Sequence, residues 1–404
     1  MSDRPALEVA DIIRAHGEDY RQARGGKLTL AEEYVLRSLA ACRTAVLGGH
    51  LEECGKCGQR RPAYNSCGNR HCPKCQAAAR AAWLDAQREN LLPVPYFHVV
   101  FTLPDHLSPL VLQNKEVLYD LLFRAAAETL QEVAATPKHM GAEIGFLTVL
   151  HTWGQNLLDH PHLHCVVPGG GLSPDGSRWI ACHKEDFFVP VKVLSAVFRG
   201  KFLDYLKRAF AENKLSFYGR LTELAQPEAF GRLLSACYGT KWVVYAKPPF
   251  GGPEQVLKYL ARYTHRVAIS NRRLISLEDG RVTFRWKNYV AGNQQQTMSL
   301  AAVEFLRRFL LHLLPSHFVR IRHYGLLANR HRAEKLARCR ELLGIRVSEI
   351  PAEPLPEPMV NGESKEEHDS KQCPACGGRM RIVGHCPRPS GRQLLEIPWP
   401  WNTS

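Results

Sequence analysis

The chain lacks any run of 18 or more apolar residues, and its first 20 residues contain no apolar segment of the signal-peptide type. We therefore expect a cytoplasmic protein that neither spans nor binds a membrane. An internal repeat is also absent, and strand-like and helix-like segments do not alternate regularly. This irregularity disfavours a parallel α/β fold. The motif HExxH does not occur, so the signature of a zinc peptidase is missing.

What the chain contains points to a globular protein with a polyanionic partner. Its 404 residues can form two or three domains, and 45% hydrophobic with 23% charged residues is typical of a soluble core-forming protein. The net charge of +14 suggests nucleic acid as the partner. Six of the 13 cysteines lie between Cys42 and Cys75. In an intracellular chain this clustering favours metal binding over disulfide bonds.

Two C-x-x-C pairs with 14 residues between them lie in this cysteine-rich segment. Cys54 and Cys57 form the first pair, and Cys72 and Cys75 form the second. Four thiolates in two such turns can enclose a structural Zn²⁺ ion, so we predict one zinc site from these four residues. Free buried thiols or a redox role are the alternatives. Further residues around the pairs are candidates for a second zinc site: Cys42, His50, Cys67 and His71. Near the C-terminus, Cys373 and Cys376 with His385 and Cys386 resemble an incomplete zinc ribbon.

A His-x-His pair lies in the segment His160 to Leu172. In an extended strand, side chains two residues apart leave the same face, so His162 and His164 can approach one metal ion. Neutral imidazole is a common ligand of divalent metals. Ordinary packing is the alternative when the pair is considered alone.

Two tyrosines one helical turn apart follow about a hundred residues later. A helix is expected to begin at Pro253, which would place Tyr259 and Tyr263 on one face. Lys258 and Arg262 form a second pair displaced by one residue. Aromatic residues at this spacing usually belong to a core. Beside a divalent cation and basic side chains, however, a tyrosine phenol becomes a nucleophile that can attack a DNA phosphodiester.

The mixture of strands and helices predicts an α+β fold with a mainly antiparallel sheet. We divide the chain into a helical, cysteine-rich module at 1–93 and a catalytic domain at 94–348. Residues 349–371 are rich in Pro and Glu and are interpreted as a linker. Residues 372–404 then form a small cysteine-containing tail.

Together these motifs resemble the two-tyrosine, HUH-type rolling-circle transposases of the insertion-sequence-91 group. The resemblance rests on several segments: YNSCGNRHCPKCQ at 64–76, WGQNLLDHPHLHCVVPGGGL at 153–172, YLARYTHRVAISNRRL at 259–274, FRWKNY at 284–289 and RIRHYGLLANR at 320–330. It implies a central antiparallel sheet flanked by helices, with the histidines on a middle strand and the tyrosine helix beside it. It also implies an N-terminal zinc-binding module.

The resemblance further implies an activity and the residues that perform it. His162 and His164 correspond to the metal-binding histidines and Tyr259 and Tyr263 to the paired nucleophiles, with Mg²⁺ or Mn²⁺ as the catalytic ion. The third ligand is expected at Gln155, with His151, His160 and His265 as alternatives. The implied reaction nicks single-stranded DNA at the ends of an insertion sequence through 5′-phosphotyrosine and transfers the strand to target DNA.

Basic residues are expected to contact the DNA backbone. The candidates in the cysteine-rich segment and near the end of the catalytic domain are Lys56, Arg60, Arg61, Arg70, Lys74, Arg320, Arg322, Arg330 and Arg332. A solvated structural surface is the alternative for each group.

Three other classes of protein remain open at this stage. A plasmid-type HUH replication initiator or relaxase would share the chemistry but act at an origin. A zinc-ribbon DNA-binding protein would use the histidines and tyrosines for packing alone. A zinc hydrolase would use His162 and His164, but no hydrolase or deaminase motif accompanies this pair. The sequence does not indicate an oligomeric state.

Overall fold

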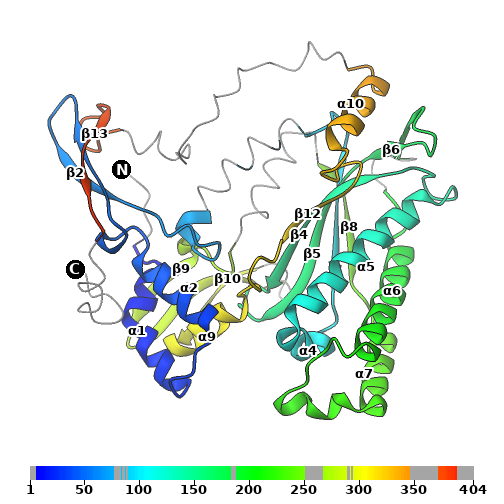
Figure 1. Cartoon of the computed structure of the whole chain (residues 1–404), viewed down its shortest axis with the longest axis horizontal. Coiled ribbons are helices and arrows are strands. Elements are labelled where there is room, and N and C mark those ends of the chain that lie inside the picture. The colour runs from blue at the N-terminus through cyan, green and yellow to red at the C-terminus, as the bar shows by residue number, and fades with distance from the viewer. Residues whose placement is uncertain are drawn as a thin grey trace.

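The computed structural model describes residues 6–76, 83, 87, 90–182, 188–250, 267–288, 292, 294–345 and 372–388. These residues form two lobes (Figure 1). The first, here called the cysteine lobe, consists of residues 6–76, 267–311 and 372–388. The second, here called the sheet lobe, consists of residues 90–250 and 321–345. No helix of the described residues is long and apolar enough to cross a membrane.

A five-stranded sheet forms the centre of the sheet lobe. Its strand order is β12-β4-β5-β3-β8, and every neighbouring pair is antiparallel. The strands are β3 (Tyr96–Thr102), β4 (Gly145–Trp153), β5 (Asp159–Pro168), β8 (Val244–Phe250) and β12 (Ile321–Gly325). The His-x-His strand β5 is therefore the middle strand, as expected. The predicted α+β class with a central antiparallel sheet is confirmed.

Strand alternation gives this sheet two different faces. Phe101, Leu150 and Leu163 point into the main core, which helices α5 and α6 cover (Figure 1). The helices on this side are α4 (Ser108–Gln113), α5 (Lys115–Ala135), α6 (Val191–Ala211) and α7 (Pro227–Gly239). On the opposite face, Leu147 and Val166 pack with α10 (Arg332–Leu342). The histidines of β5 belong to this second face.

The glycine run after β5 allows two segments to approach closely. A Cβ atom on Gly171 would lie 2.3 Å from the carbonyl oxygen of Glu143, and one on Gly170 would lie 2.6 Å from the Trp179 ring. The hairpin of β6 (Gly170–Leu172) and β7 (Trp179–Ala181) forms here. Only glycine fits such contacts without a shift of the backbone.

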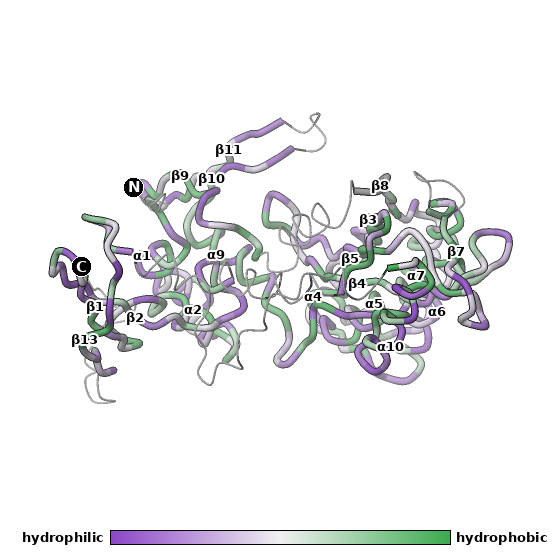
Figure 2. The backbone as a smooth tube through the Cα atoms, turned by 90° about the horizontal axis from the view of Figure 1, so that it is seen from above, coloured by the Kyte–Doolittle hydropathy of each residue, from purple (hydrophilic) through white to green (hydrophobic). Residues whose placement is uncertain are grey.

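The core of the cysteine lobe joins two distant parts of the sequence. Helices α1 (Val9–Ala23) and α2 (Leu30–Ala41) pack with α9 (Ala302–Leu311) and with the sheet β9 (Leu274–Glu278), β10 (Arg281–Asn288) and β11 (Gln294–Ala301). Thr29 and Glu32 form a capping box at the start of α2. Figure 2 shows β10 and β11 projecting from this lobe as a largely polar hairpin.

A second small sheet in the cysteine lobe contains the end of the described chain. Its order is β13-β1-β2, with β1 (Gly49–Cys54) between β2 (Arg60–Tyr64) and β13 (Met380–Cys386). The structure thus groups the chain differently from the division made on sequence. The segment 267–311, assigned to the catalytic domain, shares a core with the first 75 residues. The tail at 372–388 pairs with the N-terminal module.

Candidate functional site

Three histidines converge on the face of the central sheet opposite α5 and α6. They are His151 on β4 and His162 and His164 on β5, and one ring nitrogen of each lies within 4.8 Å of the others. His151 stands directly opposite His162 in the strand register. His151 and His164 are 3% and 8% exposed, while His162 is only partly buried. These three form a candidate metal site with one side toward solvent.

Hydrogen bonds orient two of the three rings. Nδ1 of His162 lies 2.6 Å from the carbonyl oxygen of His160, and Nδ1 of His164 lies 2.8 Å from Nε2 of His98 on β3. Because both Nδ1 atoms lie at these partners, an ion between the three rings would be bound through Nε2 of His162 and His164. Burial, together with Lys247 and His162, lowers the pKa of His98 to about 3, so this partner is a neutral ring. Sequence reasoning did not identify His98.

The third histidine of the cluster, His151, is one of the alternatives to Gln155 as the third ligand, and Gln155 itself stays a prediction. Gln155 lies beyond the end of β4, where its backbone carbonyl accepts a hydrogen bond of 2.5 Å from Arg273. His160 does not belong to the cluster, and its ring faces Asp105 at 3.9 Å. Cross-strand pairing is the physical reason that His151 belongs to it: His151 occupies the position opposite His162 on the same face. The remaining alternative, His265, lies outside the described residues.

A buried carboxylate lies at the start of β5, three residues before the His-x-His pair. Burial raises the pKa of Asp159 to about 7, although the charge of Lys115 acts in the opposite direction. A carboxyl group in this state can exchange a proton near neutral pH. Sequence reasoning did not identify this residue, since a lone aspartate at a strand end carries no signal.

The predicted nucleophiles Tyr259 and Tyr263, with Lys258 and Arg262, lie outside the described residues. The chain before them ends in β8, the edge strand next to β3. After them it resumes at Val267, which lines a cavity together with Trp153 and His312. The Trp153 ring stacks on His151 with centroids 4.8 Å apart. The described chain therefore resumes at a cavity that is also lined by Trp153, the residue stacked on His151.

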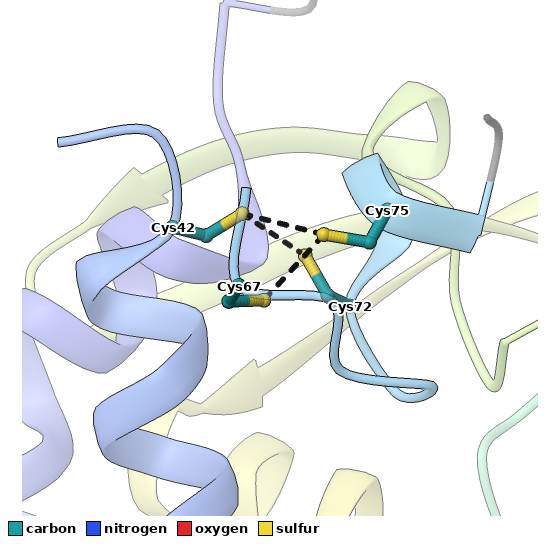
Figure 3. Close-up of side chains that lie close together, drawn as sticks. All are labelled: Cys42, Cys67, Cys72 and Cys75. Carbon is teal, nitrogen blue, oxygen red and sulfur yellow. Dashed lines mark hydrogen bonds between the residues drawn. The ribbon is translucent and has the colours of Figure 1, made fainter. Parts of the chain in front are cut away.

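Four cysteines meet inside the cysteine lobe (Figure 3). Cys42 follows α2, Cys67 and Cys72 lie on the connecting loop, and Cys75 lies on a helical turn at 73–76. The sulfur of Cys42 is 3.6 Å from the sulfurs of Cys72 and Cys75, and the sulfur of Cys67 is 3.5 Å from that of Cys75. Hydrogen bonding with Cys67 and Cys72 lowers the pKa of Cys42 to about 7. In a tetrahedral zinc site with Zn–S of about 2.3 Å, sulfurs lie about 3.8 Å apart.

A second group of four cysteines lies at the edge of the same lobe. It consists of Cys54, Cys57, Cys373 and Cys376. The predicted quartet is therefore corrected, because the two C-x-x-C pairs belong to different clusters. The β1–β2 hairpin carries Cys54 and Cys57 away from the loop of Cys72 and Cys75.

The other predicted zinc ligands belong to neither cluster. His50 lies on β1 beside Glu52, at 3.5 Å, and His71 lines the cavity near Trp153. Burial lowers the pKa of His71 to about 3. His385 and Cys386 lie on β13, where they pair with His50 and Gly49 across the strands.

Several basic residues predicted to contact DNA have structural partners. Arg70 donates to the carbonyl groups of Pro315 and Phe318, at 2.5 and 2.7 Å. Lys74 pairs with Glu8 at 2.6 Å. Arg320 donates to Gln76 at 2.7 Å, and its pKa is lowered to about 10 by burial.

Other predicted contacts lie closer to solvent. Arg60 and Arg61 pair with Glu53 and Glu52 on the neighbouring strand. Arg322 pairs with Asp120 at 2.5 Å and lies over the Phe123 ring. Lys56 and Arg330 are exposed, and Arg332 is partly exposed.

Two family models match the chain, and their ranges do not overlap. A model described as "Transposase zinc-binding domain" matches residues 12–103, and one described as "Putative transposase" matches residues 145–335. Both models describe parts of transposases, so the chain combines a transposase zinc-binding domain with a second transposase domain.

Individual relatives agree with this class. The chain is 55% identical over 382 residues to "Putative transposase y4qJ" of Sinorhizobium fredii, covering 92% of this chain and 94% of the relative. It is 32% identical over 366 residues to the transposase for insertion sequence element IS801 of Pseudomonas savastanoi pv. phaseolicola, covering 88% and 84%. The chain belongs to the IS91/IS801-like family of transposases.

Solved structures with distant similarity are conjugative relaxases. The relaxase TrwC in complex with oriT DNA, metal-free, has a TM-score of 0.24 at 16% identity and covers 62% of this chain and 73% of that chain. Its metal-bound complex has a TM-score of 0.25 at 15% identity, covering 62% and 72%.

Proposed function

We propose that this transposase nicks single-stranded DNA at the ends of an insertion sequence and transfers the strand by a rolling-circle-like mechanism. The observation that supports this function most directly is the cluster of His151, His162 and His164 on the central sheet. Three neutral nitrogen ligands leave coordination positions open, unlike a set of four thiolates. An ion held there can accept a phosphate oxygen, which a purely structural site cannot do.

The donor set fits a divalent cation, and Mn²⁺ or Mg²⁺ is the proposed ion. Mn²⁺ fits better of the two, since Mg²⁺ prefers oxygen ligands. The bound ion would act as a Lewis acid that withdraws charge from phosphorus. The protein's own contribution is to hold the imidazoles rigidly: His98 and the His160 carbonyl bind the outer nitrogens of His164 and His162.

Tyr259 and Tyr263 are the proposed nucleophiles. The phenol gives up its proton and its oxygen attacks phosphorus, the bond from phosphorus to the 3′ oxygen breaks, and the leaving 3′ oxygen takes up a proton to become a hydroxyl. The product is a 5′-phosphotyrosine, and no water is consumed. Lys258 and Arg262 are proposed to favour the phenolate by their charge. With two tyrosines, one can hold the first cleaved end while the other acts at a second site.

The positions of the flanking residues support this role for the tyrosine segment. It begins after edge strand β8 and ends before Val267, which lines the cavity beside Trp153. Trp153 in turn contacts His151. In the sequence, the tyrosine segment thus follows a strand of the histidine-bearing sheet and precedes a residue that lines the cavity beside Trp153.

The cysteine lobe is proposed to have a structural and DNA-binding role. Cys42, Cys67, Cys72 and Cys75 would hold the Zn²⁺ of the matched zinc-binding domain and perform no chemistry, because four thiolates fill the coordination sphere. Surface contacts to the DNA backbone are assigned to the exposed basic side chains, Lys56, Arg330 and Arg332.

A nicking assay on single-stranded DNA from an element end tests the proposal. With Mn²⁺ or Mg²⁺, the protein should cut this DNA and remain attached through a peptide containing Tyr259 or Tyr263, detected by mass spectrometry. Tyr259→Phe/Tyr263→Phe should abolish the adduct. Tyr245→Phe is the matched control, since Tyr245 is an exposed tyrosine on β8.

Three results would contradict the proposal. Cutting by the double variant at the wild-type rate would exclude both tyrosines as nucleophiles. Cutting of a plasmid origin in preference to the element end would instead indicate an initiator or relaxase. Full activity in the presence of EDTA would remove the histidine cluster from catalysis.

A further inference from the structure

Two short cysteine turns from opposite ends of the chain have the same backbone pattern. In Cys54-Gly-Lys-Cys57, the N–H of Gly58 donates to the carbonyl of Cys54 at 3.0 Å, and the N–H of Cys54 donates to Gln59 at 2.9 Å. In Cys373-Pro-Ala-Cys376, the equivalent bonds join Gly377 to Cys373 at 2.8 Å and Cys373 to Gly378 at 2.7 Å.

The glycine after each turn has a left-handed backbone, with φ of 72° at Gly58 and 69° at Gly377. Glycine adopts this conformation without steric cost. Such turns present two thiols to one point, as the knuckles of four-cysteine zinc sites do.

The distances between sulfurs distinguish a metal site from disulfide bonds. Cys54 and Cys376 are 3.5 Å apart, and Cys57 and Cys373 are 3.6 Å apart. A disulfide has a sulfur–sulfur bond of about 2.05 Å. The edges of a tetrahedral zinc–thiolate site are about 3.8 Å. All four sulfurs lie within 4.8 Å of one another, so each can contribute to one centre.

Hydrophobic packing alone does not explain why these cysteines lie together, because the small buried group contains Met380 and otherwise cysteines. The buried members of this small cluster are Cys54, Cys373 and Met380, with Cys376 packed against them. Gly378 leaves room for the sulfurs, since a Cβ atom there would lie 3.0 Å from Sγ of Cys54. The two turns are also joined directly, because the N–H of Gly55 donates to the carbonyl of Arg379 at 3.0 Å.

We propose that Cys54, Cys57, Cys373 and Cys376 bind a second structural Zn²⁺ that fastens the C-terminal segment to the N-terminal module. Half of its ligands lie outside the matched zinc-binding domain at 12–103. The site stands apart from the histidine cluster and does not depend on the nuclease activity.

This site would hold the C-terminal segment of the chain against the N-terminal module. The chain leaves the cysteine lobe after residue 76 and re-enters it at 267–311. It then completes the sheet lobe with β12 and α10 and returns to the cysteine lobe a second time at β13 (Figure 1). The antiparallel pairing of β13 with β1 places the returning segment beside Cys54. Zinc would make this return stable, since metal binding adds directly to the free energy of folding.

Metal analysis of the full-length protein tests the proposal. The wild-type chain should contain two zinc ions, and Cys373→Ser/Cys376→Ser should contain one. Cys386→Ser is the matched control, because Cys386 lies on β13 but outside the cluster, and it should keep both ions. In the wild type, alkylation of Cys54, Cys57, Cys373 and Cys376 should become at least about tenfold faster when a chelator is added.

A second measurement follows the attachment itself. A protease site introduced between residues 349 and 371 should yield a C-terminal fragment that remains bound to the rest of the protein. The fragment should dissociate after treatment with a chelator, or when Cys373 and Cys376 are replaced by serine.

Several outcomes overturn the proposal. They are two zinc ions in Cys373→Ser/Cys376→Ser, a single ion in the wild type with rapid alkylation of this cluster, a Cys54–Cys376 disulfide, or iron in place of zinc. The nicking activity is measured separately, so failure of the nuclease mechanism would leave the zinc content as an independent result.

Discussion

The histidine cluster of the sheet lobe and the buried cysteine cluster of the cysteine lobe are two candidate metal sites with opposite designs. His151, His162 and His164 project from neighbouring strands and leave one side open. Cys42 and Cys72, by contrast, are fully enclosed by the core that α1, α2 and α9 share. The comparison teaches that ligand number and burial separate a site for chemistry from a site for folding.

The supporting structure differs in the same way. The histidines depend on strand alternation and register, so the sheet would remain intact without an ion. Two of the cysteines, Cys67 and Cys72, lie on a loop that has little regular structure of its own. Cys42 follows α2, and Cys75 lies on a short helical turn. Removing a ligand should therefore affect activity in the first region and stability in the second.

The largest expected effect is on catalysis. His164→Ala should lower the rate of DNA nicking at least a thousandfold, equivalent to about 4 kcal/mol in the activation free energy, while the melting temperature changes little. His160→Ala is the control, because His160 lies two residues before His162 in the sequence but outside the cluster. Equal losses in both variants would contradict the assignment.

The same comparison distinguishes the two candidates for the third ligand. His151→Ala should weaken Mn²⁺ binding, measured by calorimetry, at least about tenfold, whereas Gln155→Ala should leave it unchanged. The reverse result would identify Gln155 as the ligand.

The next effect is on folding. Cys72→Ser should release one zinc ion and lower the melting temperature by at least about 10 °C, since structural zinc contributes several kcal/mol to folding. Cys182→Ser, a half-buried cysteine of the sheet lobe, should change neither quantity. Calorimetry with zinc analysis measures both. An unchanged melting temperature in Cys72→Ser would mean that this cluster does not stabilise the lobe.

The smallest effect separates structural from DNA-binding cations. Lys74→Met removes the ion pair with Glu8 and should lower the free energy of unfolding by about 2 kcal/mol, with little change in DNA affinity. Arg330→Ala should instead reduce the salt dependence of DNA binding by about one unit without loss of stability. Denaturant titration and salt-dependent binding measure the two quantities.

Sequence patterns predicted the regular elements of the sheet lobe well. The helical apolar spacing over 115–135 matches α5, the β-branched and aromatic residues at 96–102 match β3, and the segment of His162 and His164 matches β5. These segments have strong apolar periodicity because one or both faces are buried. Strands β1, β2 and β11 were missed, since their mostly polar residues, half-buried in β1 and largely exposed in β2 and β11, carry no such signal.

The candidate site was predicted only in part. The position of His162 and His164 on a middle strand was confirmed, because the two residues share a face by local geometry alone. The third histidine and both cysteine groupings depend on contacts between separate segments. Spacing along the chain joined Cys54 to Cys72, whereas the hairpin places Cys54 beside Cys376, 322 residues away.

By itself, the sequence determined the local chemistry of this transposase: a His-x-His strand, a basic chain and cysteine turns with zinc-ligand spacing. Periodicity and turn formation act between near neighbours, so a linear pattern is sufficient to show them. The tertiary structure alone decided which turns share a centre, which histidine completes the cluster and where the C-terminal strand attaches. These choices follow from strand register and core packing, which bring together residues from different segments of the chain.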